Sequence, residues 1–142
     1  MAQPQPQKMV IPSKPSQAPA VTEAILAQVQ AQGYSEHARF AVRLALDEAL
    51  SNAIRHGNCG DESKRITITY QVTAEECRIT ICDEGCGFHP ECLPDPTKPE
   101  FIERPCGRGV MLMRAYMTEV TFNPQGNCVT MLKRRDCPLP RL

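Results

Sequence analysis

The hydrophobic pattern of the first third of the chain has helical periodicity. Residues 18–32 combine Ala, Gln, Glu, Val, Ile and Leu, which favour a helix, and Gly33 predicts its end. Ser35 is a good N-cap for a second helix, which we predict to run to about His56 and to end at Gly57. The residues that share one arc of this helix form its predicted core face: Val42, Leu46, Ala49, Leu50 and Ala53.

Alternation of apolar and polar residues with a period of two predicts the strands. A short apolar strand closed by prolines is predicted within residues 8–16. Residues 64–72 and 76–83 are rich in β-branched side chains and form a predicted pair of strands. Residues 109–117 return to a helical pattern, and two further strands are expected at 119–123 and 127–135, around the turn "PQGN".

The remaining segments lack periodicity. Residues 1–7 are rich in Gln and Pro and are predicted to be a disordered tail, and residues 137–142 an irregular one. Residues 89–106 contain five prolines among 18 residues, and loops of this length in compact domains are often lids. We therefore predict one domain at 8–136, with a lid at 89–106 that joins two glycine-rich loops.

Composition excludes several classes of protein. The 142 residues carry 16 basic and 16 acidic side chains, so no electrostatic footprint for nucleic acid or an anionic membrane is expected. No apolar run approaches the ~20 residues that span a bilayer, and the N-terminus lacks the apolar core of a secretion signal. The expected location is the cytoplasm.

The eight cysteines allow two interpretations. A zinc site could use Cys82, Cys86, His89 and Cys92, because thiolates and an imidazole a few residues apart can form a tetrahedron. Their spacing is irregular, however, and there is no paired CxxC. We favour reduced thiols without a metal.

Candidate chemistry lies in three places. Glu48 and Asn52 are four residues apart on the second helix, either at the edge of a partly dry cleft or as a surface hydrogen-bonded pair. Asp83 and two glycines alternate in "CDEGCGF" after a buried strand, where a plain turn would need one glycine. Two more glycines occur in "CGRGV", directly before the predicted helix at 109–117.

Together, "DEALSNAIRHGN", "CDEGCGF" and "CGRGVMLMRAYM" resemble the three nucleotide-binding boxes of the GHKL (histidine-kinase-like) ATPase superfamily. Within it, "IPSKP", "TKPE" and "GRGVMLM" followed by "MTEV" resemble the anti-sigma-factor serine/threonine-protein kinases. The resemblance covers about residues 8 to 135. Three ordered boxes at this spacing are a specific signal, whereas one glycine motif alone would be weak.

The resemblance implies a role for each box. Asp83 would accept a hydrogen bond from the adenine amino group, with Gly85 and Gly87 letting the backbone approach the base and ribose. Asn52 would give an oxygen to Mg²⁺, and Glu48 would take the proton from the attacking hydroxyl. The lid residue Arg104 would steady charge on the γ-phosphate. The phosphates would be held at the start of a helix by Gly107, Arg108, Gly109 and Val110.

Two positions depart from the family. Thr118 stands where the family usually has Asp. The threonine that helps to hold adenine is replaced by Asn127 or Cys128, and Thr130 on the same strand could substitute for it.

The implied fold is an α/β (α+β) two-layer sandwich of the Bergerat type, with a mixed, mostly antiparallel sheet and helices on one face. The implied function is that of an anti-sigma-factor serine kinase that binds Mg·ATP, sequesters a sigma factor and phosphorylates a serine on a STAS-type anti-anti-sigma protein. A homodimer is implied, with no direct contact to nucleic acid or membrane. Three alternatives remain: an ATP-binding regulatory switch without kinase activity, a detached histidine-kinase ATPase domain, and a zinc-binding redox module.

Overall fold

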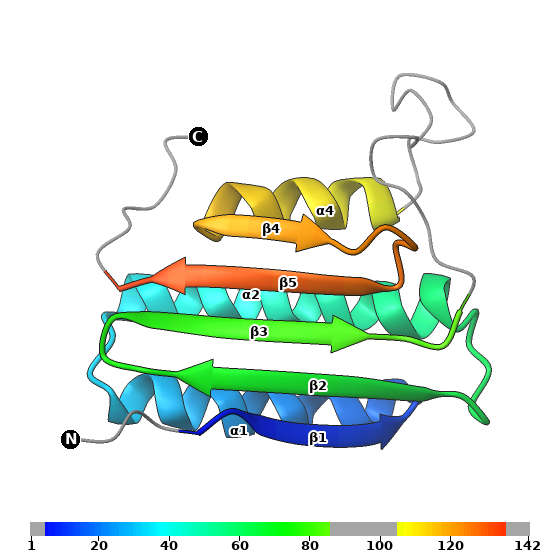
Figure 1. Cartoon of the computed structure of the whole chain (residues 1–142), viewed down its shortest axis with the longest axis horizontal. Coiled ribbons are helices and arrows are strands. Elements are labelled where there is room, and N and C mark those ends of the chain that lie inside the picture. Colours follow the sequence, from blue (N-terminus) through cyan, green and yellow to red (C-terminus); the bar gives the residue numbers. More distant parts are fainter. Residues whose placement is uncertain (1–4, 86–104, 136–142) are drawn as a thin grey trace.

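The computed structural model describes residues 5–85 and 105–135. One sheet of five strands carries all of its described helices on one face, so the molecule has two layers (Figure 1). The strand order is β1-β2-β3-β5-β4. The strands are β1 (Gln7–Pro12), β2 (Arg65–Val72), β3 (Glu76–Cys82), β4 (Glu119–Phe122) and β5 (Cys128–Arg134).

The fold class predicted from the sequence is confirmed, with one refinement. Each neighbouring pair in the sheet is antiparallel, so the sheet of the described residues is antiparallel and not mixed. The first strand also begins one residue earlier than predicted, because Gln7 pairs with Tyr70 and its side chain accepts a hydrogen bond from the Tyr70 hydroxyl at 2.9 Å.

Three α-helices cover the sheet within the described ranges: α1 (Ala18–Ala31), α2 (Glu36–Asn52) and α4 (Pro105–Tyr116). A short 3₁₀ turn, η1 (Pro15–Gln17), leads into α1. The Ser35 hydroxyl accepts a hydrogen bond from the Ala38 N–H at 3.1 Å, which confirms Ser35 as the N-cap of α2. The core face predicted for this helix is also confirmed, since all five of its residues are buried.

The strands bury every second side chain against the helices. In β3 the buried residues are Cys77, Ile79 and Ile81, and in β5 Val129 and Met131 point to the same side. The side chains between them lie on the other face of the sheet, among them Thr80 and Thr130. Burial of the apolar face between the two layers therefore forms the single core of the described chain.

Helix α4 begins at Pro105, so the helix includes residues that we predicted to be loop. Proline is well suited to the first turn of a helix, where its missing N–H leaves no bond unmade. Gly107 and Gly109 consequently lie inside the first two turns of α4 and do not precede it. The rest of the predicted lid, residues 89–104, lies outside the described residues, as do residues 1–4 of the predicted N-terminal tail and all of the predicted C-terminal one.

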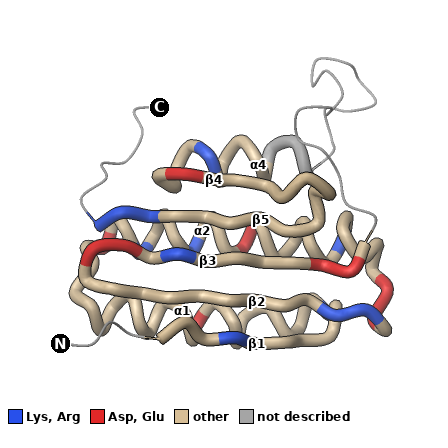
Figure 2. The backbone as a smooth tube through the Cα atoms, viewed as in Figure 1, with Lys and Arg blue, Asp and Glu red and all other residues tan. Residues whose placement is uncertain are grey.

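Charged residues of both signs gather at the two ends of the strands (Figure 2). The start of β2 is basic and the segment after β3 is acidic, and the two lie at the same end of the sheet. None of the helices within 5–85 and 105–135 has the length and apolar content needed to cross a bilayer.

Candidate nucleotide site

Helix α2 changes its geometry in the middle of the first box. After Asn52 the chain forms a π-helical turn, η2 (Ala53–Gly57), instead of continuing as an α-helix to His56 as predicted. Single π turns inside or at the end of helices are frequent at functional sites. This turn brings Gly57 against the loop that follows β3.

Gly57 and Gly85 lie where the first and second boxes come too close for any side chain. A Cβ atom on Gly57 would collide with the carboxylate of Asp83, and a Cβ on Gly85 would collide with the carbonyl oxygen of Gly57. Gly57 and Gly85 therefore let the first and second boxes touch through their backbones. Gly85 thus has a role in packing the protein, besides the approach to a nucleotide that the sequence suggested.

The carboxylate of Asp83 is half-buried at the end of β3. Burial raises the pKa of Asp83 above its ordinary value, while the hydrogen bond from the Gly85 N–H and the charge of Lys64 act in the opposite direction. The Gly85 N–H lies 2.8 Å from Asp83 Oδ1. The described residues thus hold one carboxylate oxygen in place at the rim of a pocket.

A pocket between the sheet and the helices joins Asp83 to the end of α2. Its lining comes from α2, η2, α4 and the ends of β3, β4 and β5: Ala49, Asn52, Ala53, Ile81, Asp83, Met113, Phe122, Gly126, Asn127, Cys128 and Val129. Its walls are mostly apolar, with the side chains of Asn52, Asp83 and Asn127 among them.

The third box meets the first at Gly109. A Cβ on Gly109 would lie 2.9 Å from Glu48 Oε2 and 3.1 Å from Asn52 Nδ2, so a larger residue at this position of α4 would require these two side chains to shift. Asn52 is only 6% exposed, and its Nδ2 has no hydrogen-bond partner. An unpaired buried amide is costly unless a ligand completes it.

These features fit a metal-bound nucleotide. The Asn52 amide can present Nδ2 as a donor or, after half a turn, Oδ1 as a ligand for Mg²⁺. Glu48 stands beside it, one helical turn away on the same face. The structure therefore brings together Glu48, Asn52 and Gly109 at one place. Asp83 lines the same pocket as Asn52, and Gly85 lies against Asp83 and Gly57.

Thr130 does not belong to this arrangement. It lies on the face of the sheet opposite to the helices, and its hydroxyl hydrogen-bonds with that of Thr80 at 3.0 Å. Thr130 lies two residues further along β5 than Cys128, on the same face of the strand, and the pocket is at the start of β5. Of the residues considered for the missing threonine, Asn127 and Cys128 line the pocket and Thr130 does not.

The other predicted site residues lie in α4 or outside the described residues. Gly87 and Arg104 lie outside the described residues. Gly107 and Arg108 belong to the first turn of α4, where backbone N–H groups have no partner within the helix, so a phosphate could bind there. Gly109 lies beyond the first four residues, and the side chain of Val110 is buried in the core.

The prediction of reduced thiols is wrong for two cysteines. Cys82 and Cys128 face each other across β3 and β5 and form a disulfide. Their Cα atoms are 4.0 Å apart, because they occupy a ladder position without hydrogen bonds, where antiparallel strands come closest. Cys82 is therefore not a thiolate zinc ligand in this structure, and the other three residues of that alternative lie outside the described ones.

Sequence reasoning missed Asn58. This residue is fully buried, and its side chain contacts the loop after β3. A buried asparagine directly after a glycine that ends a helix is a weak signal, because asparagine is also common in exposed turns.

The described chain is thus a two-layer α/β sandwich with a mostly apolar pocket between its helices and its sheet. A family model described as a histidine kinase-like ATPase domain matches residues 11–133. The chain belongs to this family.

Individual relatives agree with this assignment. The serine-protein kinase RsbW of Oceanobacillus iheyensis is 26% identical over 133 residues, which are 89% of this chain and 84% of that protein. The anti-sigma F factor of Clostridium perfringens (strain SM101) is 31% identical over 61% of this chain and 63% of that protein. The serine/threonine-protein kinase BtrW of Bordetella bronchiseptica is 29% identical over 63% of this chain and 64% of that protein. Two of these relatives are named as protein kinases and one as an anti-sigma factor, and the family match confirms the predicted GHKL-type ATPase fold.

A solved structure shows the same fold. The RsbU and RsbW domains of Rv1364c from Mycobacterium tuberculosis match 97% of this chain with a TM-score of 0.63 at 14% identity. The chain spans about a third of that structure, 34% of its length.

Proposed function

We propose that this protein is a Mg·ATP-dependent serine kinase that phosphorylates a STAS-type anti-anti-sigma protein and sequesters a sigma factor. The observation that carries the proposal is the meeting of Glu48 and Asn52 with Gly109, beside an Asn52 nitrogen that has no partner. The names of the relatives, serine-protein kinase RsbW and anti-sigma F factor, support the choice of substrate and partner. A homodimer in the cytoplasm is part of the same proposal.

In this proposal each residue has one task. Asn52 binds the metal, which neutralises phosphate charge when the nucleotide is present. Asp83 accepts the adenine amino group, and the first turn of α4, with Gly107 and Arg108, binds phosphate oxygens. Glu48 takes the proton from the attacking serine hydroxyl of the protein substrate.

The test separates the kinase from an ATP-binding switch. Glu48→Gln removes the base and keeps the shape, so we expect unchanged Mg·ATP affinity and a loss of phosphoryl transfer of about 10²- to 10⁴-fold. The measurement is transfer of labelled γ-phosphate to STAS-domain proteins from the same cell, in parallel with ATP titration. Asp47→Asn, on the same helix but outside the pocket, is the matched control and should transfer at the wild-type rate.

Two results would contradict the proposal in different ways. Transfer by Glu48→Gln at the wild-type rate would remove Glu48 as the base. Tight Mg·ATP binding by the wild-type protein without transfer to any STAS-domain protein would instead favour the regulatory switch.

A further inference from the structure

Asn58 connects the helix layer to the loop that carries Asp83. Its side chain is 0% exposed and is satisfied at both ends. Its Oδ1 accepts the Glu84 N–H at 2.8 Å, and its Nδ2 donates to the Arg65 carbonyl at 3.1 Å. Its own N–H donates to the Ala53 carbonyl at 2.9 Å, so η2 fixes the position of the residue.

The loop after β3 is held by three consecutive backbone N–H groups. The Asp83 N–H donates to the Asn127 carbonyl at 2.9 Å, as an extension of the β3–β5 ladder. The Gly85 N–H closes a local turn onto Asp83 Oδ1. The middle one, the Glu84 N–H, is bound by Asn58, so among these three bonds only this one comes from the helix layer.

This bond bears on the direction of the Asp83 side chain. The Asp83 carboxylate packs directly against Gly57, the residue before Asn58. Gly57 leaves the space for the carboxylate, and Asn58 holds the neighbouring peptide group. A shift of that peptide group would move Asp83 relative to the pocket wall formed by Asn52 and Ala53.

We propose that Asn58 is a positioning residue for base recognition, which holds the Asp83 carboxylate where it accepts the amino group of adenine. The inference rests on the proposed nucleotide site and adds to it the residue that sets the preference for adenine. Asn58 does not touch the nucleotide itself; it acts through the Glu84 N–H.

The test must separate positioning from plain stability, because loss of a buried hydrogen-bonded side chain destabilises a fold in any case. Purine riboside 5′-triphosphate provides the separation, since it is ATP without the 6-amino group. Dissociation constants for both nucleotides are measured with Mg²⁺ by titration calorimetry for the wild-type protein and Asn58→Ser. Serine is small enough for the site, but its hydroxyl is too short to replace the amide.

We expect the wild-type protein to prefer ATP by about 10- to 100-fold, the usual value of one hydrogen bond to a charged group. In Asn58→Ser the preference should fall to about threefold or less, with little change for the analogue. An undiminished preference, or equal loss of affinity for both nucleotides, would overturn the inference. Absence of ATP binding by the wild-type protein would instead contradict the proposed function.

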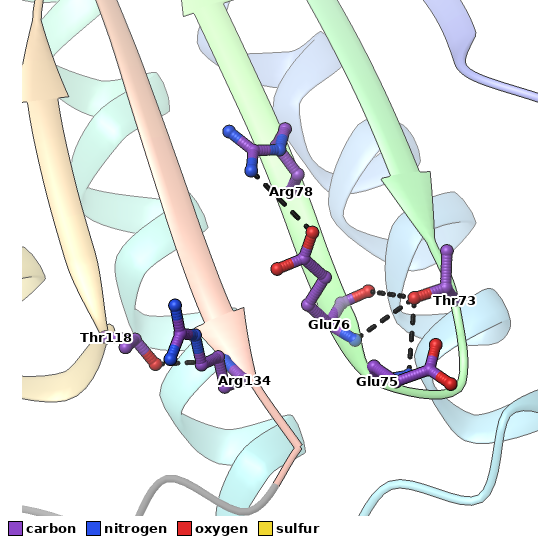
Figure 3. Close-up of polar contacts among 6 residues, drawn as sticks. All are labelled: Thr73, Glu75, Glu76, Arg78, Thr118 and Arg134. Atoms are coloured by element: carbon purple, nitrogen blue, oxygen red, sulfur yellow. Dashed lines mark hydrogen bonds and ion pairs between the residues drawn. The ribbon is translucent and has the colours of Figure 1, made fainter.

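Thr73 offers a matched control at the other end of β3 (Figure 3). Its hydroxyl also organises a loop by accepting backbone N–H groups, from Glu75 at 3.3 Å and Glu76 at 3.1 Å. A strand of seven residues, roughly 23 Å, separates it from the Asp83 loop. Thr73→Ala should therefore lower the free energy of unfolding and leave the preference for ATP unchanged.

A measurement on the wild-type protein covers the case in which Asn58→Ser does not fold. Coupling is reciprocal, so a ligand that holds the Asp83 carboxylate should stabilise the bond between Asn58 and Glu84. Hydrogen exchange of the Glu84 amide should slow more with saturating ATP than with the saturating analogue. Equal exchange rates with the two nucleotides would contradict the role of Asn58.

Discussion

At the scale of single residues, the pocket contains two polar groups whose burial costs free energy in the protein without a ligand. The Asp83 carboxylate is partly removed from water, and the Asn52 amide is buried with an unpaired nitrogen. Functional sites are where burial shifts pKa values and leaves polar groups unmatched, because a ligand is to complete them. The same residues should therefore oppose stability in the free protein.

Substitution of Asp83 by asparagine tests this conflict. The raised pKa of Asp83 means that the native state favours its protonated form, so wild-type stability from this group is lost as pH rises through the raised value. Asp83→Asn removes this loss. We expect the mutant to gain in stability relative to the wild type as pH rises above the ordinary pKa of an aspartate, while it loses ATP binding. Urea denaturation at several pH values measures the difference.

Asp61 supplies the control with the opposite sign. It is exposed, and hydrogen bonds from Ser63 lower its pKa, so its contribution is present above the ordinary pKa and is lost as pH falls. Asp61→Asn should therefore be less stable than the wild type at pH 7 and approach it at low pH. A difference for Asp83→Asn that does not change with pH would show that burial of this carboxylate has no energetic consequence.

At the scale of elements, sequence periodicity predicted what is local. The arc on α2 and the Ser35 cap depend on residues within a few positions of each other, and both are confirmed. The start of α4 was missed because two glycines, Gly107 and Gly109, follow Pro105, and packing against α2 outweighs their low helix propensity. The π turn at η2 has no sequence signature of its own.

The pairing of strands that are distant in the chain could not be predicted from the sequence either. The register that places Cys82 opposite Cys128 depends on β5 lying beside β3, and 46 residues separate the two cysteines. Alternation predicts a strand and its two faces, but not its neighbour. The sequence therefore could not show that Cys82 and Cys128 face each other, which is the contact that allows them to form a disulfide.

The disulfide should stabilise the fold under oxidising conditions only. Closing a loop of this length typically contributes about 2–4 kcal/mol. We expect Cys82→Ser/Cys128→Ser to unfold at lower urea concentration than the wild type in oxidised samples, and at a similar concentration once both are reduced. Cys59→Ser, at an exposed free cysteine, is the control and should behave as the wild type. Non-reducing peptide mapping that finds Cys82 and Cys128 as free thiols in air-oxidised protein would refute the pairing.

At the scale of the whole molecule, the site exists only because the two layers meet. The first box ends α2, the second follows β3 and the third lies in α4, and each touches another through a glycine. The three boxes were recognisable in the sequence as motifs, yet the contact of Gly57 with Asp83 and the tie through Asn58 arise from packing between layers. Motif residues were therefore predictable, whereas those that hold the motifs together were not.

This arrangement predicts that the nucleotide and its metal stabilise the whole fold. A ligand that binds the native state at 100 times its dissociation constant adds about 2.7 kcal/mol to the free energy of unfolding. For a domain of this size the midpoint of thermal unfolding should rise by roughly 5–11 °C with Mg·ATP.

Removal of the metal tests the part assigned to Asn52. With ATP and EDTA in place of Mg²⁺, we expect only a small shift in the unfolding midpoint of the wild-type protein, because the phosphates then lack their counter-ion. Asn52→Ala should show this small shift with or without Mg²⁺, whereas Asp47→Asn should retain the full difference. Differential scanning fluorimetry at fixed nucleotide concentration provides the comparison. An equal response of Asn52→Ala and the wild type to Mg²⁺ would place the metal elsewhere, since a ligand that does not touch Asn52 cannot lose stabilisation when that amide is removed.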